Sequence, residues 1–425
     1  MSNWVERDTA VVWHGFTQMA TFADNAPVIV ERAEGRELID VEGRRYLDAI
    51  SSLWVTTLGH RVPELDRAIE DQVGRVAHST MLGHGNRVTI ELAEALASVV
   101  PLDDPHFLFA SDGAAAVEQA IKIAFQYWRN IGEAGRDIYL SFGDAYHGDT
   151  IGSLSVGGGG FGSEIFEPLR FPVLRAPGFD DPACMSTATK MIFEHAKDLA
   201  AVVVEPLVQG AAGMKMAPPE DFSMLSDACI EAGVLLICDE VATGFGRTGT
   251  LFASEQCGIQ PDLMALGKGL TGGYLPMAAT AANRRVYDAF LGEDLGPKTL
   301  YHGHSYSGNA LCAAVALEHL ALLNEGDVMN NVAERSAQLG ALLDEHVAPL
   351  SAVREVRLTG LMCGVELEPG RRRGRAVCAA AVEQGVLLRP LGDVVIIMPP
   401  LTITAAEIER IVGVVSEAIQ EVAPG

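Results

Sequence analysis

Lysine is scarce in this chain of 425 residues. Only six of its 31 basic residues are lysines, at positions 122, 190, 197, 215, 268 and 298, against 56 acidic residues and a formal net charge of −25. A surface this acidic repels a phosphate backbone and an anionic lipid surface, so we expect neither nucleic acid nor a membrane as a partner. Lysine chemistry, where it occurs, has few available positions.

Other absences narrow the class of protein further. The seven cysteines include no C-x-x-C pair, and the run His302-Gly303-His304 has no third ligand at a zinc-site spacing, so we expect no bound metal. No apolar run reaches the length of about 18 residues that a membrane-spanning helix needs. The first residues lack the basic and apolar segments of a signal peptide. We therefore predict a cytoplasmic protein whose cysteines are buried thiols.

Hydrophobic residues make up 48% of the chain and charged residues 20%, which excludes a disordered or fibrous protein. Short apolar runs alternate with stretches of helical periodicity such as residues 115–128. Strands that are apolar on both faces and separated by helices imply the α/β class, with a mostly parallel sheet covered on both sides. The predicted strands span residues 107–110, 138–142, 201–204, 234–238 and 263–266.

The C-terminal part has a different pattern. Helices are predicted at residues 328–346, 375–384 and 405–422, and strands at residues 353–358, 361–367 and 394–398. The last helix is expected to begin with a capping box formed by Thr404 and Glu407. We predict a large domain over residues 61–322 and a smaller α+β domain that combines residues 1–60 with residues 323–425.

One predicted strand runs directly into a carboxylate. Asp239 follows the apolar run 234–238, where an unpaired charge is costly or simply takes up a proton. Asp239 therefore needs a cationic partner. An arginine such as Arg247, solvent at the end of the strand, and a positively charged ligand all remain open as that partner.

Lys268 stands in an apolar, glycine-rich stretch with no acidic residue within five positions. A lysine so placed tends to have a lowered pKa and suits Schiff-base chemistry; the alternative is a side chain that extends along apolar surface to solvent. Asp239 and Lys268 both follow strands at the edge where open α/β sheets bind ligands. Pyridoxal phosphate would supply what each lacks, a protonated ring nitrogen for Asp239 and an aldehyde for Lys268.

A phosphate site is also available. Gly113 and Ala114 follow the first predicted strand and open the helix 115–128, so their amides can face an anion at a helix N-terminus. An ordinary N-cap by Ser111 or Asp112 is a good explanation of the same residues taken alone. Tyr146, which begins the run Tyr-His-Gly-Asp-Thr, offers an aromatic ring that would stack on a flat cofactor.

These motifs resemble a known family. The run from Asp239 to Gly249 (Asp-Glu-Val-Ala-Thr-Gly-Phe-Gly-Arg-Thr-Gly), followed by Pro261-Asp262 and Gly267-Lys268-Gly269, is similar to the class III aminotransferases of PLP fold type I. The resemblance extends from about Val12 to the last helix. Further motifs resemble the branch that converts 7-keto-8-aminopelargonate to 7,8-diaminopelargonate in biotin synthesis. They are Trp13-His14, Ser51-Ser52-Leu53-Trp54, Gln126-Tyr127-Trp128, Tyr146-His147-Gly148-Asp149-Thr150, Val208-Gln209-Gly210-Ala211 and Leu388-Arg389-Pro390-Leu391-Gly392.

The resemblance implies a site for pyridoxal 5′-phosphate. The catalytic residues would be Lys268 as the Schiff-base lysine, Asp239 as the partner of the ring nitrogen, and Tyr146 beside the ring. Cofactor contacts are expected at Gly113, Ala114, Tyr146, Asp239, Val241 and Lys268, with His304 and Ser305 reaching in from the neighbouring subunit. Such a shared site implies a homodimer.

The resemblance also implies a substrate site. Contacts with substrate are expected at Phe16, Leu53, Trp54, Tyr146, Lys268, Gly303 and Arg389. Arg389 would pair with the substrate carboxylate through a bidentate fork.

The amino donor stays open between S-adenosylmethionine and lysine. Enzymes of this branch that use S-adenosylmethionine typically carry a Tyr after Trp-His-Pro, where this chain has Gly15-Phe16, and a Trp pair after the two serines, where this chain has Leu53-Trp54. Ala114 replaces a common Ser, and His304-Ser305 replaces a common Pro-Thr. Two rival functions also remain: a general ω-amino acid or diamine:pyruvate transaminase, and a PLP-binding protein or lyase without transamination.

Overall fold

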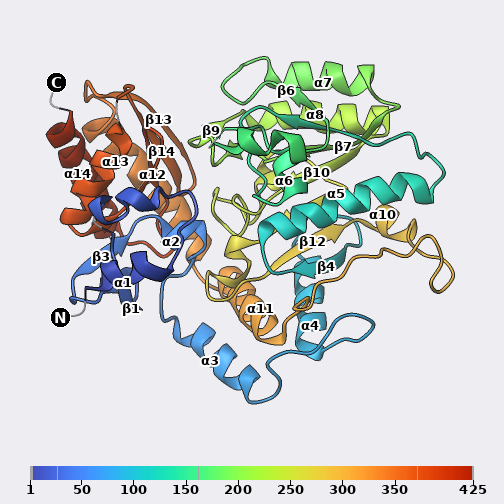
Figure 1. Ribbon diagram of the computed structural model, residues 1–425, viewed down its shortest axis with the longest axis horizontal. Helices are drawn as coiled ribbons and strands as arrows, with labels where there is room; N and C mark the ends of the chain where they lie inside the picture. Colours follow the sequence, from blue (N-terminus) through green and yellow to red (C-terminus); the bar gives the residue numbers. More distant parts are fainter. Residues whose placement is uncertain (1–2, 26, 161, 371, 424–425) are drawn as a thin grey trace.

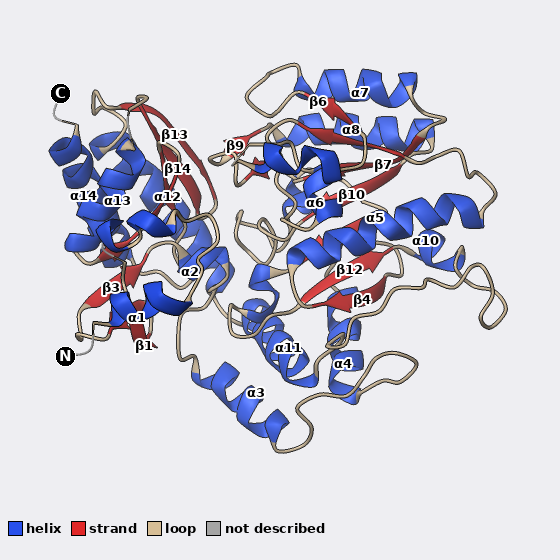
Figure 2. Ribbon diagram, viewed as in Figure 1, coloured by secondary structure: helices blue, strands red, loops and turns tan. Residues whose placement is uncertain are grey.

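The computed structural model describes residues 3–25, 27–160, 162–370 and 372–423, and its elements form two groups (Figures 1 and 2). A seven-stranded sheet with the order β4-β12-β11-β10-β7-β5-β6 forms the centre of the larger group. These strands are β4 (His106–Ala110), β5 (Ile138–Phe142), β6 (Val173–Ala176), β7 (Leu199–Val204), β10 (Leu235–Asp239), β11 (Leu263–Leu266) and β12 (Ala278–Ala282).

The sheet is mostly parallel, which confirms the predicted α/β class. Neighbouring strands from β11 to β6 pair in parallel, whereas β12 is antiparallel to both β11 and β4. All five predicted strands are present. Strand β10 begins one residue later than predicted and takes in Asp239.

Two strands of this sheet were not predicted, β6 and β12. Strand β12 has the sequence Ala-Ala-Thr-Ala-Ala and is buried at every position. Its small side chains carry little of the β-branched or aromatic signal that marks a strand, and alanine by itself favours helix. Tertiary pairing with β4 and β11 therefore decides the conformation of this segment.

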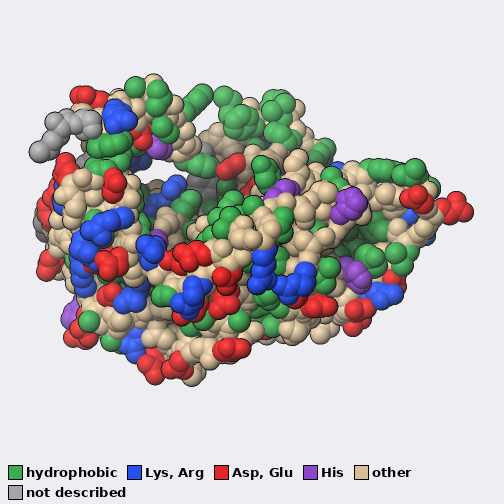
Figure 3. Space-filling view, turned by 90° about the horizontal axis from the view of Figure 1, so that it is seen from below, with side chains coloured by type: hydrophobic (Ala, Val, Ile, Leu, Met, Phe, Trp, Pro, Cys, Tyr) green, Lys and Arg blue, Asp and Glu red, His purple; other side chains and the backbone are tan. Residues whose placement is uncertain are grey.

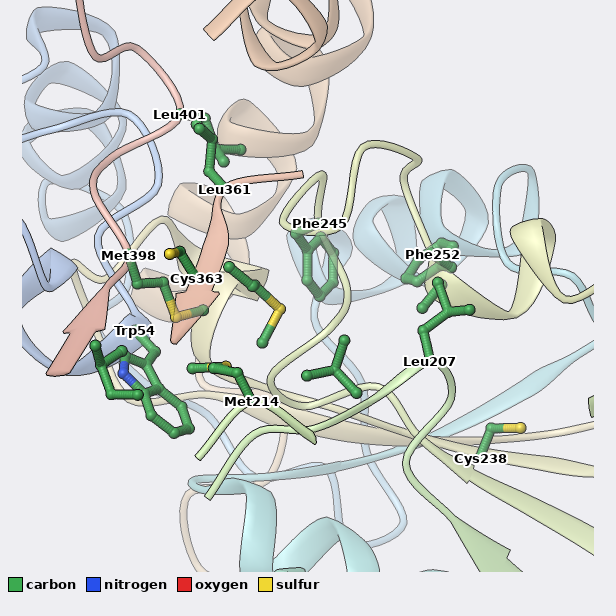
Figure 4. Packing of buried hydrophobic residues seen from close by; sticks show 14 of the residues in the cluster. Trp54, Leu207, Met214, Cys238, Phe245, Phe252, Leu361, Cys363, Met398 and Leu401 are labelled. Atoms are coloured by element: carbon green, nitrogen blue, oxygen red, sulfur yellow. The ribbon is translucent and has the colours of Figure 1, made fainter. Parts of the chain in front are cut away.

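Both faces of the large sheet are covered. Leu236 and Cys238 of β10 belong to one core cluster, and Leu235 and Ile237 belong to a second. Since side chains alternate along a strand, the two clusters lie on opposite faces. Helix α5 contributes to the second cluster, whereas α7, α8 and α11 contribute to the first. Figure 4 shows part of the first cluster, with Trp54 among its residues.

The helices have the following bounds: α1 (Trp4–Val11), α2 (Ser51–Trp54), α3 (Pro63–Val73), α4 (Arg87–Ala97), α5 (Gly113–Asn130), α6 (Ile151–Val156), α7 (Cys184–Glu194), α8 (Pro219–Ala232), α9 (Ala253–Gln256), α10 (Arg284–Asp288), α11 (Ala310–Glu325), α12 (Val328–His346), α13 (Arg373–Glu383) and α14 (Ala405–Val422). Helices α12 and α14 have the predicted bounds. The Thr404 and Glu407 capping box of α14 is confirmed.

The smaller group combines both ends of the chain, drawn in blue and in red in Figure 1. One sheet has the order β1-β2-β3-β15 and another the order β13-β14-β17-β16. Their strands are β1 (Val30–Glu34), β2 (Glu37–Asp40), β3 (Arg45–Asp48), β13 (Val353–Thr359), β14 (Met362–Leu367), β15 (Val386–Leu387), β16 (Arg389–Leu391) and β17 (Val394–Ile397). Leu47 of β3 pairs with Val386 of β15, so the N-terminal and C-terminal parts share a sheet. The domain boundaries after residues 60 and 322 stay a prediction.

All seven cysteines are buried and free. Within the described ranges, every helix is too short or too polar to cross a bilayer.

Candidate active site

A cavity of about 570 Å³ opens where the large sheet meets the smaller group of elements. In Figure 3 the molecule is seen from below, hollowed between its left-hand part and the remainder. The cavity is lined by Phe16, Leu53, Trp54, Asp112, Gly113, Ala114, Tyr146, His147, Gly148, Asp149, Thr150, Glu205, Ala211, Asp239, Val241, Ala242, Lys268, Arg389 and Leu391. Ten of the thirteen residues predicted for the site are in this list.

The carboxyl ends of four adjacent strands supply the polar floor of the cavity. His147 follows β5, Glu205 follows β7, Asp239 ends β10 and Lys268 follows β11. The sheet order β5-β7-β10-β11 brings these residues together although they span more than a hundred positions of sequence. This edge is the expected ligand site of an open α/β sheet.

Asp239 has a histidine as its protein partner. Its Oδ2 lies 2.7 Å from Nδ1 of the buried His147, and its Oδ1 accepts a hydrogen bond from the Val241 amide at 3.0 Å. The Arg247 alternative is wrong, because the buried Arg247 guanidinium donates instead to the Pro399 carbonyl and to Ser51 Oγ. Both bonds hold Asp239 in a fixed orientation facing the cavity.

Lys268 begins the short 3₁₀ helix η4 (Lys268–Thr271) and has a φ of +41°. Its Nζ lies 5.3 Å from the centroid of the Trp54 ring inside the cavity, so the alternative of a side chain extended away to the outer surface is wrong. Burial lowers the pKa of Lys268, and the Asp239 and Glu205 carboxylates oppose that effect. A positive φ in a non-glycine residue is strained, and such residues concentrate at functional sites.

The N-terminus of α5 has the expected N-cap, and the phosphate contact at its first residues stays a prediction. Asp112 caps the helix by accepting from the Ala115 amide. Among the described residues no hydrogen bond uses the Gly113 or Ala114 amide. A Cβ added to Gly113 would lie 2.6 Å from Cγ1 of Val241, so only glycine fits there. The two amides therefore remain available to an anion beside Val241.

Tyr146 is tied to the loop that carries it. Its hydroxyl donates to Asp149 at 2.8 Å, and its amide donates to Glu205 Oε1. Burial raises the pKa of Tyr146, and the hydrogen bond to Asp149 adds to this effect. The ring is thus a neutral, oriented wall of the cavity at physiological pH.

Glu205 was not singled out from the sequence. Its carboxylate accepts from the amides of Tyr146 and Gly210, and burial raises its pKa to about 7. The only sequence signal was a carboxylate directly after the apolar run 201–204, the same signal that marked Asp239. His147 was named only within a motif, and its pairing with Asp239 was not predicted.

The raised pKa of Glu205 predicts a pH dependence of stability. An unfolded glutamate titrates near about 4.3, so the folded state keeps a proton that the unfolded chain releases. The stabilisation of the folded state by this proton is fully present below the unfolded pKa of about 4.3 and is lost as pH rises through the folded pKa of about 7. In Glu205→Gln, the fall of Tm between about pH 5.5 and about pH 8 should be shallower than in the parent. Glu345→Gln, at a side chain that is 71% exposed, serves as the control and should follow the parent curve.

Gly303, His304 and Ser305 lie outside this cavity, in the loop before α11. His304 Nδ1 accepts from the Tyr306 amide. Their predicted roles toward a neighbouring subunit's cofactor and substrate stay predictions.

Comparison with known proteins identifies the family. The sequence pattern of "Aminotransferase class-III" matches residues 18–419. The chain belongs to the class III aminotransferases. An adenosylmethionine-8-amino-7-oxononanoate aminotransferase from Nitratidesulfovibrio vulgaris is 44% identical over 97% of this chain and 80% of its own length.

Solved structures of aminotransferases have the same fold. The adenosylmethionine-8-amino-7-oxononanoate aminotransferase from Methanocaldococcus jannaschii superposes with a TM-score of 0.95 and 39% identity, over 98% of both chains. A transaminase from the marine bacterium Virgibacillus gives a TM-score of 0.92 at 30% identity, over 99% of both chains. The chain is therefore an aminotransferase of the PLP-dependent transferase fold.

The cofactor of this class III aminotransferase is pyridoxal 5′-phosphate, and the cavity fits it. The cavity offers a lysine of lowered pKa, a buried carboxylate fixed by His147, and two unused amides at a helix N-terminus where a side chain cannot fit. A primary amine, an anion for a ring nitrogen, and amides for a phosphate are the groups this cofactor requires.

Proposed function

We propose that this class III aminotransferase transfers an amino group to the ketone of 8-amino-7-oxononanoate (7-keto-8-aminopelargonate), giving 7,8-diaminopelargonate in biotin synthesis. The observation that carries the proposal is the near full-length similarity to proteins named for this substrate, at 44% identity in sequence and a TM-score of 0.95 in structure. The amino donor is S-adenosylmethionine or lysine.

The walls of the cavity suit a long aliphatic acid. Phe16, Leu53, Trp54 and Leu391 provide apolar surface for the methylene chain. Arg389 lines the same cavity from β16, and among the described residues no carboxylate pairs with its guanidinium. We propose that Arg389 binds the substrate carboxylate and so fixes the ketone at the opposite end of the chain.

Lys268 and Asp239 are the catalytic residues in this proposal. The cofactor, when bound, supplies an electron-withdrawing ring and a carbonyl group. The Lys268 amine, whose pKa burial lowers, accepts and returns a proton at the carbon that exchanges its amino group. Asp239, oriented by His147 and the Val241 amide, presents its carboxyl group at the floor of the cavity. Val241 and Tyr146 line the same cavity.

We expect Arg389→Met to raise the KM for 8-amino-7-oxononanoate by about 30-fold or more, because the substrate carboxylate then lacks a partner in a partly desolvated site. The KM for a simple amine that has no carboxylate should change much less. Steady-state kinetics with both compounds checks this. Arg354→Met, at a side chain that is 60% exposed and paired with Glu366, is the matched control. An equal KM increase for both compounds would contradict the assigned role.

The proposal extends to assembly and compartment. Leu82, Tyr301 and Tyr306 are large and more than half exposed near the loop that carries Gly303. Exposed apolar residues grouped in this way mark interaction surfaces, and a homodimer would place Gly303, His304 and Ser305 at the partner's cavity. Seven free buried thiols suit a reducing compartment, which supports the cytoplasm.

Mixing the purified holoenzyme with each donor separately tests the function. One of the two donors should bleach the cofactor absorbance, and subsequent addition of 8-amino-7-oxononanoate should restore it with formation of the diamine. The assignment would be contradicted if neither donor bleached the cofactor absorbance, or if no diamine formed. Turnover of simple amines with pyruvate, but not of 8-amino-7-oxononanoate, would instead favour a general ω-transaminase.

A further inference from the structure

The segment Ser51–Trp54, labelled α2, forms one wall of the cavity; its backbone is non-helical at Ser52 and Leu53, so it is a strained turn, and a buried carboxylate holds it. We propose that Asp48 is a positioning residue for the amino acceptor: it holds the turn Ser51–Trp54 and thereby places Leu53 and Trp54 against the substrate. The inference rests on the proposed function only for the choice of substrate in its test.

The turn does not hold its shape by itself. Ser51, Ser52 and Trp54 have φ values of +51°, +60° and +65°, although none of them is glycine. Side chains with a Cβ disfavour this left-handed region, so consecutive residues there persist only where surrounding contacts impose them. The backbone of the turn adds only the bonds from the Trp54 amide to Ile50 and from the Val55 and Thr56 amides to Ser51.

Asp48 supplies the contacts that fix the turn. It ends β3 and is fully buried. Its Oδ1 accepts from the Ser52 amide at 2.8 Å, and its Oδ2 lies 3.0 Å both from Ser52 Oγ and from Nε2 of His60. Only a carboxylate accepts at all three positions, because an asparagine would present a donor at one of its two terminal atoms.

The turn is also anchored by the C-terminal half of the chain. Ser51 Oγ donates to the Met398 carbonyl at 2.7 Å, and the Arg247 guanidinium donates to Ser51 Oγ at 3.3 Å. Asp48 therefore holds Ser52, while Met398 and Arg247 hold the preceding residue, Ser51.

The position of the turn matters for the reaction. Leu53 and Trp54 line the cavity, and the Trp54 ring lies 5.3 Å from Lys268 Nζ. The same ring packs on Gly210, where an added Cβ would lie 3.2 Å from it. A shift of the turn thus moves the wall that contacts the substrate and faces Lys268, and a displacement of about 1 Å in a site of this kind costs as much as 100-fold in kcat/KM.

The test compares Asp48→Asn with Asp40→Asn. Asp40 is a buried carboxylate of the same sheet that accepts from the Glu42 and Arg44 amides and from the Tyr46 hydroxyl, away from the cavity. In Asp48→Asn we expect the KM for 8-amino-7-oxononanoate to rise about tenfold with a smaller change in kcat. Hydrogen exchange should accelerate in the peptide that covers residues 50–56. Asp40→Asn should accelerate exchange around residues 40–46 and leave the KM unchanged.

Ser52→Ala is a milder second variant, which removes one donor to Asp48 and serves if Asp48→Asn does not fold. It should show the same KM and exchange effects at smaller size. Faster exchange in the turn with an unchanged KM, or equal KM changes in the Asp48 and Asp40 variants, would overturn the inference. If the wild-type enzyme does not use 8-amino-7-oxononanoate, the proposed function fails, and the same KM comparison with the acceptor that it does use decides the role of Asp48.

Discussion

Lys268→Ala should reduce transamination by about 10⁴-fold or more, the scale on which loss of an enzyme's nucleophile acts. Among the described residues Lys268 is the only lysine that lines the cavity. Its amine is beside Trp54 in a site where burial lowers its pKa. No other side chain of the cavity can both bind the cofactor carbonyl and carry the proton that amino transfer requires. Single-turnover kinetics with each donor measures the loss.

A second measurement separates this role from mere damage to the fold. After borohydride treatment, intact-mass spectrometry should find the cofactor attached to the parent chain and not to Lys268→Ala. Lys190→Ala, at a side chain of α7 that is 75% exposed, should retain both the attachment and the activity. A Lys268→Ala variant that keeps its physiological activity and still binds pyridoxal phosphate would support the rival reading of a PLP-binding protein or lyase.

The sequence predicted the Asp239 and Lys268 pair because both residues break a local rule. Each is a charged group next to a buried strand, where a charge is costly unless function retains it. The local sequence could not predict which residues surround Asp239 and Lys268 in the fold. His147 lies 92 positions from Asp239 and meets it only because β7 brings the ends of β5 and β10 together. Arg247 is much closer in sequence, but the fold directs it to the Pro399 carbonyl.

Element type was predicted best where periodicity was strong. Helices α12 and α14 repeat apolar residues over many turns, and their predicted bounds agree with the structure. Strand β12 and the turn Ser51–Trp54 show the opposite case. Pairing on both sides creates the alanine-rich strand, and contacts from Asp48 and Met398 impose positive φ values on the turn. In neither segment do the side chains of the segment itself determine its backbone conformation.

Asp239→Asn is expected to lower kcat/KM on the order of 10³-fold, since it removes a fixed charge from a buried catalytic site while keeping the size of the side chain. The asparagine oxygen still accepts from the Val241 amide, as Asp239 Oδ1 does at 3.0 Å. Its amide then faces Nδ1 of His147, which favours the opposite tautomer of that ring. The variant therefore tests the charge of the side chain at position 239 while its size and its hydrogen bond from the Val241 amide are kept.

Asp262→Asn is the matched control. Asp262 precedes β11 at the amino edge of the same sheet, accepts from the Leu236 amide and pairs with Arg285. Its substitution removes a less buried carboxylate, 14% exposed against 6% for Asp239, from the opposite edge, so it should lower Tm and leave kcat/KM nearly unchanged. Equal activity losses in the two variants would mean that Asp239 acts through stability alone. A loss confined to Asp239→Asn, with the parent Tm retained, would show that the charge held by His147 takes part in the reaction.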